Sequence, residues 1–208
     1  MRMPINFAAV FLGLLIFCAG HAAVAAQLPK KYYVPVSASK PNQQLFNEAV
    51  LIYSNAARKQ NGRAPLRLDP GLARAAGGHA ANMARYKKIS HELPIRGQKV
   101  LKQRMSKQSV SYYLAAENIA KNKVYQLVGR PISTGSKGCQ FVYSDTGKPV
   151  PIHTYASLAQ QAVERWAASP KHRASLLSKK FTRLGSGLAT DPSGPACGDT
   201  YMVQTFAD

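Results

Sequence analysis

Acidic residues are scarce in this sequence of 208 residues. It contains 9 Asp and Glu against 28 Lys and Arg, which gives a formal net charge of +19 at pH 7. Such an excess favours polyanionic partners, among them nucleic acid, anionic lipid headgroups, lipopolysaccharide and acidic wall polymers. The basic residues are scattered rather than gathered in a stripe with stacking aromatic rings, which disfavours nucleic acid. A solvated basic surface without a specific partner is an equally good interpretation.

Long hydrophobic runs are absent after the N-terminus. The first residues carry one positive charge at Arg2, an apolar stretch over 7–19, and small residues that include the A-x-A-like Ala23-Val24-Ala25. This pattern predicts a secretory signal peptide over residues 1–26. The uncharged run is shorter than the ~20 residues that a transmembrane anchor needs. We therefore predict a secreted or periplasmic protein whose mature chain has no transmembrane segment. Export makes nucleic acid the poorest of the anionic candidates.

Cysteine is also rare. Of the three cysteines, Cys18 lies in the predicted signal peptide, which leaves Cys139 and Cys197. Two thiols in an exported protein usually pair, so we expect a structural disulfide rather than a catalytic thiol. In the chain-entropy model, closing a loop of roughly 58 residues stabilises the fold by about 3–4 kcal/mol.

The mature chain is long enough for one domain with a real core. Residues 27–44 contain three prolines and little periodicity, and we expect an extended lead-in there. The domain then covers residues 45–208.

Apolar spacing predicts four helices in this domain. The first runs from Phe46 to a stop signal at Asn61-Gly62, and the second begins at Asp69-Pro70. The third covers 158–166, and a short fourth helix, capped by Ser169, ends near Leu177.

Alternating patterns predict strands toward the C-terminus. Segments 140–143 and 149–152 flank a turn and predict a hairpin, while 184–189 and 201–206 predict paired core strands. Segment 114–120 is a short apolar stretch that contains Glu117. Early helices followed by a strand-rich end favour an α+β fold, with helices covering an antiparallel sheet.

Common catalytic signatures are missing: there is no H-E-x-x-H zinc motif and no G-x-S-x-G elbow. Glu117 lies among apolar residues, where an unpaired carboxylate is unfavourable, so we expect a partner, plausibly a histidine. His172 falls near the start of the fourth helix, where the helix dipole favours a neutral ring fit to bind a metal. For His79, on the second helix, we favour a surface position over a place in a cleft with His91.

The ordered set of segments resembles bacterial domains of the CAP superfamily, which contains the cysteine-rich secretory, antigen 5 and pathogenesis-related 1 proteins (the SCP domain). The resemblance runs from about residue 45 to the end. Its segments are Tyr53-Ser-Asn-Ala-Ala-Arg58, His79-Ala-Ala-Asn-Met83, Ile89-Ser90-His91, Ala116-Glu117-Asn118-Ile119-Ala120, Trp166-Ala-Ala-Ser169-Pro-Lys-His172-Arg and Tyr201-Met-Val-Gln-Thr-Phe206.

The resemblance implies an α-β-α sandwich with a central cleft, which in many members holds two histidines and two glutamates and sometimes a divalent ion. His91, Glu117 and His172 carry over. The place of the second glutamate is taken by Ser169, and Glu164 is a nearby but off-register substitute. Three protein ligands with an open water position would suit zinc. A hydrogen-bonded polar cluster that orders the core is the alternative.

Three functions are compatible with these observations. The first is a binding protein that captures a lipid, a sterol or an anionic envelope component through the His/Glu cleft and the basic surface. The second is a metal-dependent hydrolase with zinc on His91 and His172 and with Glu117 as base or third ligand. The third is a disulfide-stapled scaffold that binds another envelope protein. We favour the first, and an enzymatic function is less well supported.

Overall fold

The computed structural model describes residues 28–127, 129–134 and 139–208. The predicted signal peptide therefore lies outside the described residues. In the part of the chain that is described, no helix is both long enough and apolar enough to cross a bilayer.

A four-stranded sheet forms the centre of the molecule, in the order β1-β5-β6-β2. Its strands are β1 (Arg67–Leu68), β5 (Arg183–Asp191), β6 (Asp199–Ala207) and β2 (Ala115–Lys123). The β5–β6 and β6–β2 pairs are antiparallel, and the short β1 lies parallel to β5. The predicted pairing of the two C-terminal strands is confirmed, with Leu184 opposite Phe206.

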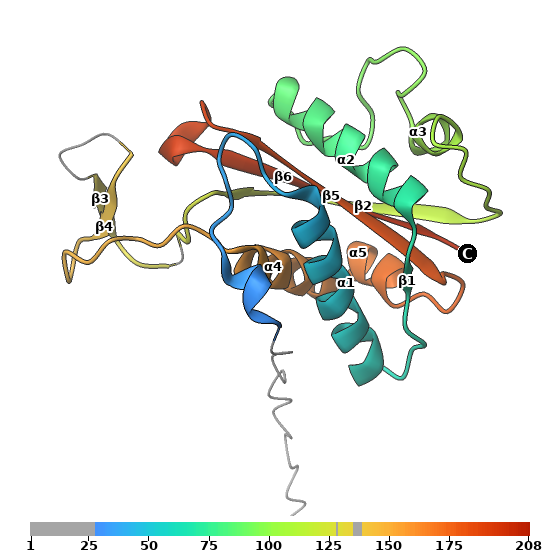
Figure 1. Cartoon of the computed structure of the whole chain (residues 1–208), viewed down its shortest axis with the longest axis horizontal. Coiled ribbons are helices and arrows are strands. Elements are labelled where there is room, and N and C mark those ends of the chain that lie inside the picture. Colours follow the sequence, from blue (N-terminus) through green and yellow to red (C-terminus); the bar gives the residue numbers. More distant parts are fainter. Residues whose placement is uncertain (1–27, 128, 135–138) are drawn as a thin grey trace, which may run out of the picture.

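Helices cover both faces of this sheet, so the fold is the α-β-α sandwich that the resemblance implied. In Figure 1, α2 (Pro70–Arg85) and α3 (Leu101–Ser106) lie on one side of the strands. The other side carries α1 (Gln43–Gln60), α4 (Tyr155–Ala168) and α5 (Pro170–Leu176).

Alternation along the strands builds two separate cores. On β6, Met202 and Phe206 point to the side of α1 and α4 and join the larger core around Trp166. Tyr201 and Val203 point to the side of α2 and form a second core with its alanines. Because neighbouring side chains on a strand alternate between faces, each central strand serves both layers.

Two glycines bring α2 unusually close to the sheet. A Cβ atom on Gly185 would clash with the backbone of Leu72 and Ala73, and one on Gly187 would clash with the backbone of Ala76. The close approach therefore depends on the glycines of β5. Gly78, within α2, has open space around it.

Of the two N-terminal caps that the sequence predicts, Asp69 is confirmed and Ser169 is not. Asn42, Asp69 and Thr154 cap α1, α2 and α4 by accepting a backbone N–H at the third helical position. Ser169 precedes α5 as expected, but its side chain makes no capping hydrogen bond. Its backbone carbonyl instead accepts the N–H of Arg173.

Three local expectations are corrected by the structure. The lead-in is not wholly extended, because a 3-10 helix, η1, forms at Lys30–Tyr33, and α1 already begins at Gln43. Segment 114–120 belongs to the nine-residue strand β2. Segment 149–152 forms no regular strand and makes isolated antiparallel bridges only, from Pro149 to Val142 and from Ile152 to Tyr125.

The predicted hairpin is only partly formed. Across the predicted turn, the N–H of Tyr143 donates to the carbonyl of Lys148 and that of Val150 to the carbonyl of Phe141. The regular ladder of β4 (Phe141–Tyr143) is formed with β3 (Ile132–Thr134) instead. β3 and β4 form an arm that projects away from the sandwich in Figure 1. The predicted disulfide between Cys139 and Cys197 is present and ties this arm to η2 (Pro195–Cys197), the turn before β6.

Candidate functional site

Glu117 projects from the exposed edge of the sheet toward the α2 and α3 layer. It lies on β2, opposite Thr205 of β6, and β2 is an outer strand of the sheet. The next residue, Asn118, points to the other face, where it bonds Gln204 and the carbonyl of His172. The strand therefore presents an acid to one layer and an amide to the other.

His91 lies in the loop that follows α2 and binds Glu117 directly. Its Nδ1 is 2.9 Å from Glu117 Oε1. Because an ionised carboxylate only accepts hydrogen bonds, Nδ1 carries the proton in this contact. The His91 side chain is 48% exposed whereas that of Glu117 is only 4% exposed, so the histidine connects a buried acid to the surface.

Arg104 is the residue of this site that the sequence analysis missed. It comes from α3 and is 2% exposed, and its Nη2 donates to Glu117 Oε2 at 2.8 Å. Its Nη1 lies 3.1–3.3 Å from the carbonyl oxygens of His91, Gln98 and Lys99. Arg104 therefore neutralises the acid and also holds the loop that carries His91.

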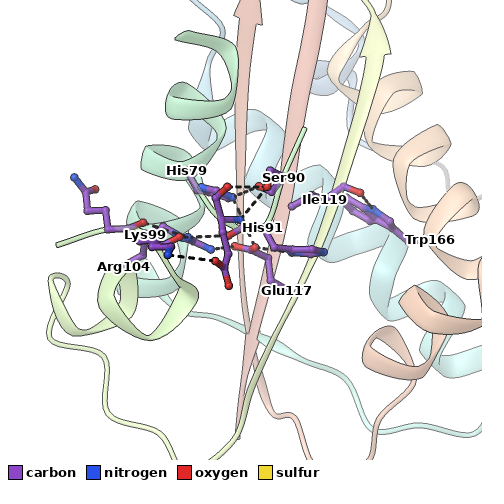
Figure 2. A network of polar contacts seen from close by, with 10 residues as sticks. His79, Ser90, His91, Lys99, Arg104, Glu117, Ile119 and Trp166 are labelled. Carbon is purple, nitrogen blue, oxygen red and sulfur yellow. Dashed lines mark hydrogen bonds and ion pairs between the residues drawn. The ribbon is translucent and has the colours of Figure 1, made fainter. Parts of the chain in front are cut away.

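His79 of α2 completes the buried side of the cluster. It is completely buried, so the preference for a surface position is wrong. Its Nε2 donates to the carbonyl of Ser90 at 2.9 Å and lies 3.8 Å from Glu117 Oε1. Its Nδ1 has no hydrogen-bond partner among the described residues. Figure 2 shows how these side chains converge from α2, the following loop, α3 and β2.

The electrostatics of the cluster favour one negative and one positive charge. Burial alone would raise the pKa of Glu117, but the hydrogen bond from His91 and the charge of Arg104 outweigh it, so the pKa lies below its usual value. Burial lowers the pKa of His79, against the attraction of Glu117. Glu117 is therefore ionised, His79 is neutral, and Arg104 supplies the balancing charge.

His172 lies near this cluster but does not bond its acid. It is on α5, on the opposite side of the sheet from α2, and its carbonyl accepts a hydrogen bond from Asn118. Burial lowers the pKa of its ring, with smaller contributions in the same direction from His91 and Lys171. No hydrogen bond or ion pair joins the His172 ring to Glu117 in the described part of the chain.

Glu164 is not part of the cluster. It is exposed on α4 and accepts a hydrogen bond from Gln160, one helical turn earlier. Trp166 on the same helix is buried and donates from Nε1 to the carbonyl of Ile119 on β2 at 3.2 Å, as Figure 2 shows. The tryptophan thus anchors α4 to the strand that carries Glu117.

These residues, as they lie, do not fit a divalent metal. Each carboxylate oxygen of Glu117 already accepts a hydrogen bond, one from His91 and one from Arg104. A metal would also bring two positive charges next to a buried guanidinium. Over the described ranges, no three His, Cys, Asp or Glu side chains are arranged to hold a metal ion. The geometry supports the hydrogen-bonded polar cluster more directly than a three-ligand zinc site.

The comparisons with known proteins agree with the fold and identify its family. The model of the CAP family, described as the cysteine-rich secretory protein family, matches residues 51–206. The chain belongs to this family. The match begins within α1 and ends one residue before the end of β6, and its range contains His91, Glu117 and His172.

Solved structures show the same fold as this CAP protein. One is an extracellular protein containing an SCP domain from Bacillus anthracis, with 23% identity and a TM-score of 0.53. The match covers 78% of this chain but only 40% of that protein. Another is an outer surface protein of Borrelia burgdorferi, with 17% identity and a TM-score of 0.56, over 83% and 98% of the two chains. A search of curated proteins finds no significant match.

Proposed function

We propose that this CAP protein is exported and binds an anionic component of the cell envelope, such as an anionic lipid headgroup, lipopolysaccharide or an acidic wall polymer. The observation that carries the proposal is the state of its acidic residues. Seven of the nine already form ion pairs with Lys or Arg in the structure: Glu48, Asp69, Glu92, Glu117, Asp145, Asp191 and Asp199. The acids thus neutralise only a few of the basic residues, and a large positive excess faces solvent.

The cavities of the molecule support the same ligand class. Four cavities of about 350–580 Å³ are lined by described residues, and each has at least one Lys or Arg in its wall. None of these four is lined by His91, Glu117 or His172. An anionic ligand therefore has more support than a sterol, which needs an enclosed apolar pocket.

The histidines contribute to this function at the edge of the sheet. His91 has its Nδ1 fixed by Glu117, which leaves Nε2 to meet a ligand, and burial, with a smaller contribution from His91, lowers the pKa of His172. Arg104 and Glu117 hold His91 in one orientation. In this proposal the cluster positions a hydrogen-bonding group beside the basic surface and carries out no hydrolytic step.

Vesicle binding tests the proposed function. We expect the mature protein to bind phosphatidylcholine vesicles that contain phosphatidylglycerol, or lipopolysaccharide, and to dissociate as salt is raised, because exposed charges are screened. Vesicles of phosphatidylcholine alone are the control. Binding that ignores salt, or equal binding to neutral vesicles, would contradict the proposal.

Export has its own test. Mass spectrometry of the protein recovered from the periplasm or the medium should give a mature chain that starts at or near Gln27. A full-length protein confined to the cytoplasm would contradict export.

A further inference from the structure

A basic cavity lies at the end of the sandwich opposite the β3–β4 arm, between the C-terminus of α1 and the helices α4 and α5. It measures about 510 Å³ and carries two arginines, Arg63 and Arg173, together with Asn61. The remaining wall is made of small or apolar residues, and none of the lining residues is acidic. The cavity is separate from the cluster around Glu117.

The arginines around this cavity differ in whether their buried N–H groups have hydrogen-bond acceptors. Arg58, on the last turn of α1, does not line the cavity; it is buried and donates to the carbonyl oxygens of Ala64, Leu176, Ser178 and Phe181. The Nε of Arg63 is also shielded from solvent but has no hydrogen-bond partner among the described residues. Because a buried donor without an acceptor is unfavourable, Arg63 is left with an unfulfilled bonding requirement.

The positive charges here also lack a counter-charge. Burial and then the nearby charge of Arg63 lower the pKa of Arg58, which shows that the two guanidinium groups repel each other. Arg173 contacts only a neutral partner, donating to Asn61 Oδ1 at 3.3 Å. Lys59 and Lys180 are exposed close by in the sequence. No carboxylate forms an ion pair with any of these five residues in the described structure.

We propose that this cavity binds the phosphate group of a mono- or diester, with Arg63 and Arg173 as its two ligands. A guanidinium offers a planar fork of donors that matches two phosphate oxygens, and two such forks hold the anion from both sides. Asn61 keeps Arg173 oriented toward the cavity. The proposal shares with the proposed function only the premise of an anionic ligand, because it places the ligand away from His91.

Phosphate binding by matched variants tests this site. The affinities of inorganic phosphate and glycerol phosphate are measured by isothermal titration calorimetry for the mature wild type and each variant. In the wild type, NMR titrations that follow the Arg Nε–Hε signals show which arginines respond. The test variant is Arg63→Gln with Arg173→Gln. The control, Lys88→Gln with Arg96→Gln, removes the same charge from exposed residues elsewhere. If the double variant fails to fold, Arg173→Gln alone, at an exposed position, is the test variant.

We expect the test variant to bind glycerol phosphate at least about tenfold more weakly than the wild type, while the control changes by no more than about twofold. Equal weakening in both variants, or titration without a response at Arg63 and Arg173, would overturn the site.

Vesicles distinguish the sources of the phosphate. Loss of phosphatidylglycerol-vesicle binding in the test variant alone assigns the site to a lipid headgroup. Loss of glycerol phosphate binding without loss of vesicle binding assigns it to a soluble or polymeric ester. If the wild type binds anionic vesicles but no phosphate, this site is refuted and the proposed function survives. If it binds neither, both proposals fail.

Discussion

At the scale of single residues, Glu117 is one of two acids, with Asp199, whose side chains are almost completely buried. A carboxylate in such a place is unfavourable unless it is paired and hydrogen-bonded. Arg104 supplies the charge, and His91 supplies the second hydrogen bond. The Glu117 carboxylate is therefore satisfied by the protein's own groups.

Removal of Arg104 should destabilise the fold strongly. Arg104→Met leaves Glu117 buried without its counter-charge and releases three loop carbonyls. We expect the free energy of unfolding to fall by about 3–5 kcal/mol. Urea denaturation measures this change in the free energy of unfolding, with Arg96→Met at an exposed position as the control. A loss of less than about 1 kcal/mol would mean that the ion pair between Arg104 and Glu117 contributes little to stability.

The pH dependence of stability should report on Glu117. Its pKa is lower in the folded protein than its ordinary value of 4.5, so its stabilisation is present above pH 4.5 and is lost as the pH falls through the folded pKa. Other carboxylates act in the same direction, so the informative quantity is the difference between variants. We expect Glu117→Gln to lose less stability than the wild type between pH 5 and pH 3 in urea titrations. The exposed Glu164→Gln is the control, and identical acid profiles for wild type and Glu117→Gln would refute the assignment.

The sequence predicts part of this cluster. A lone acid in an apolar stretch required a partner, and His91 is in contact with it. Arg104 was missed because α3 is short and lacks a strong helical pattern. His79 was misplaced although its spacing from Ala76 and Ala80 puts it on the buried face of α2. The apolar periodicity of the helix predicts the burial of His79 better than the polarity of its side chain does.

At the scale of elements, the contact between α2 and β5 depends on glycine. Gly187→Ala should force the helix away from the sheet, because its Cβ would meet backbone atoms that cannot move independently. We expect a loss of about 2 kcal/mol or more in the free energy of unfolding. Gly78→Ala is a matched control within α2. It has open space, and should stabilise the helix by about 0.5–1 kcal/mol. Similar effects of the two substitutions in thermal or urea unfolding would contradict the close approach.

The helices were easier to predict than the strands. Caps such as Asp69 and apolar spacing locate α1, α2 and α4 to within a few residues. The strand β2 carries Glu117, Asn118, Lys121 and Asn122, so it lacks the alternation of a half-buried strand. Its structure comes from tertiary partners, namely β6 beside it and the polar groups of both helical layers, which local sequence does not reveal.

At the scale of the whole molecule, one covalent link fastens the projecting arm to the sandwich. Cys139→Ser with Cys197→Ser should lower the free energy of unfolding by about 3–4 kcal/mol, because the open chain regains loop entropy over the 58-residue separation. Chemical denaturation with and without reductant measures it. Reductant should destabilise the wild type and leave the double variant unchanged, and an equal response would contradict the prediction.

The overall architecture could be predicted because the family's segments occur in order, each with its own weak pattern. The disulfide followed from cysteine number and from predicted export. The β3–β4 arm and the basic cavity at Arg63 could not be predicted from the sequence, because their formation depends on how loops that are distant in the chain meet. Net charge leads to the proposed class of ligand, an anion, but does not predict where it would bind.

The central claim is that the polar cluster is balanced by Arg104 and needs no metal. Zinc titration of the metal-free mature protein by calorimetry tests it most directly, with His91→Ala and His172→Ala as comparisons. The account predicts no stoichiometric zinc binding at micromolar concentrations and the same weak response in all three proteins. One zinc ion bound per wild-type chain, and lost in both histidine variants, would contradict it.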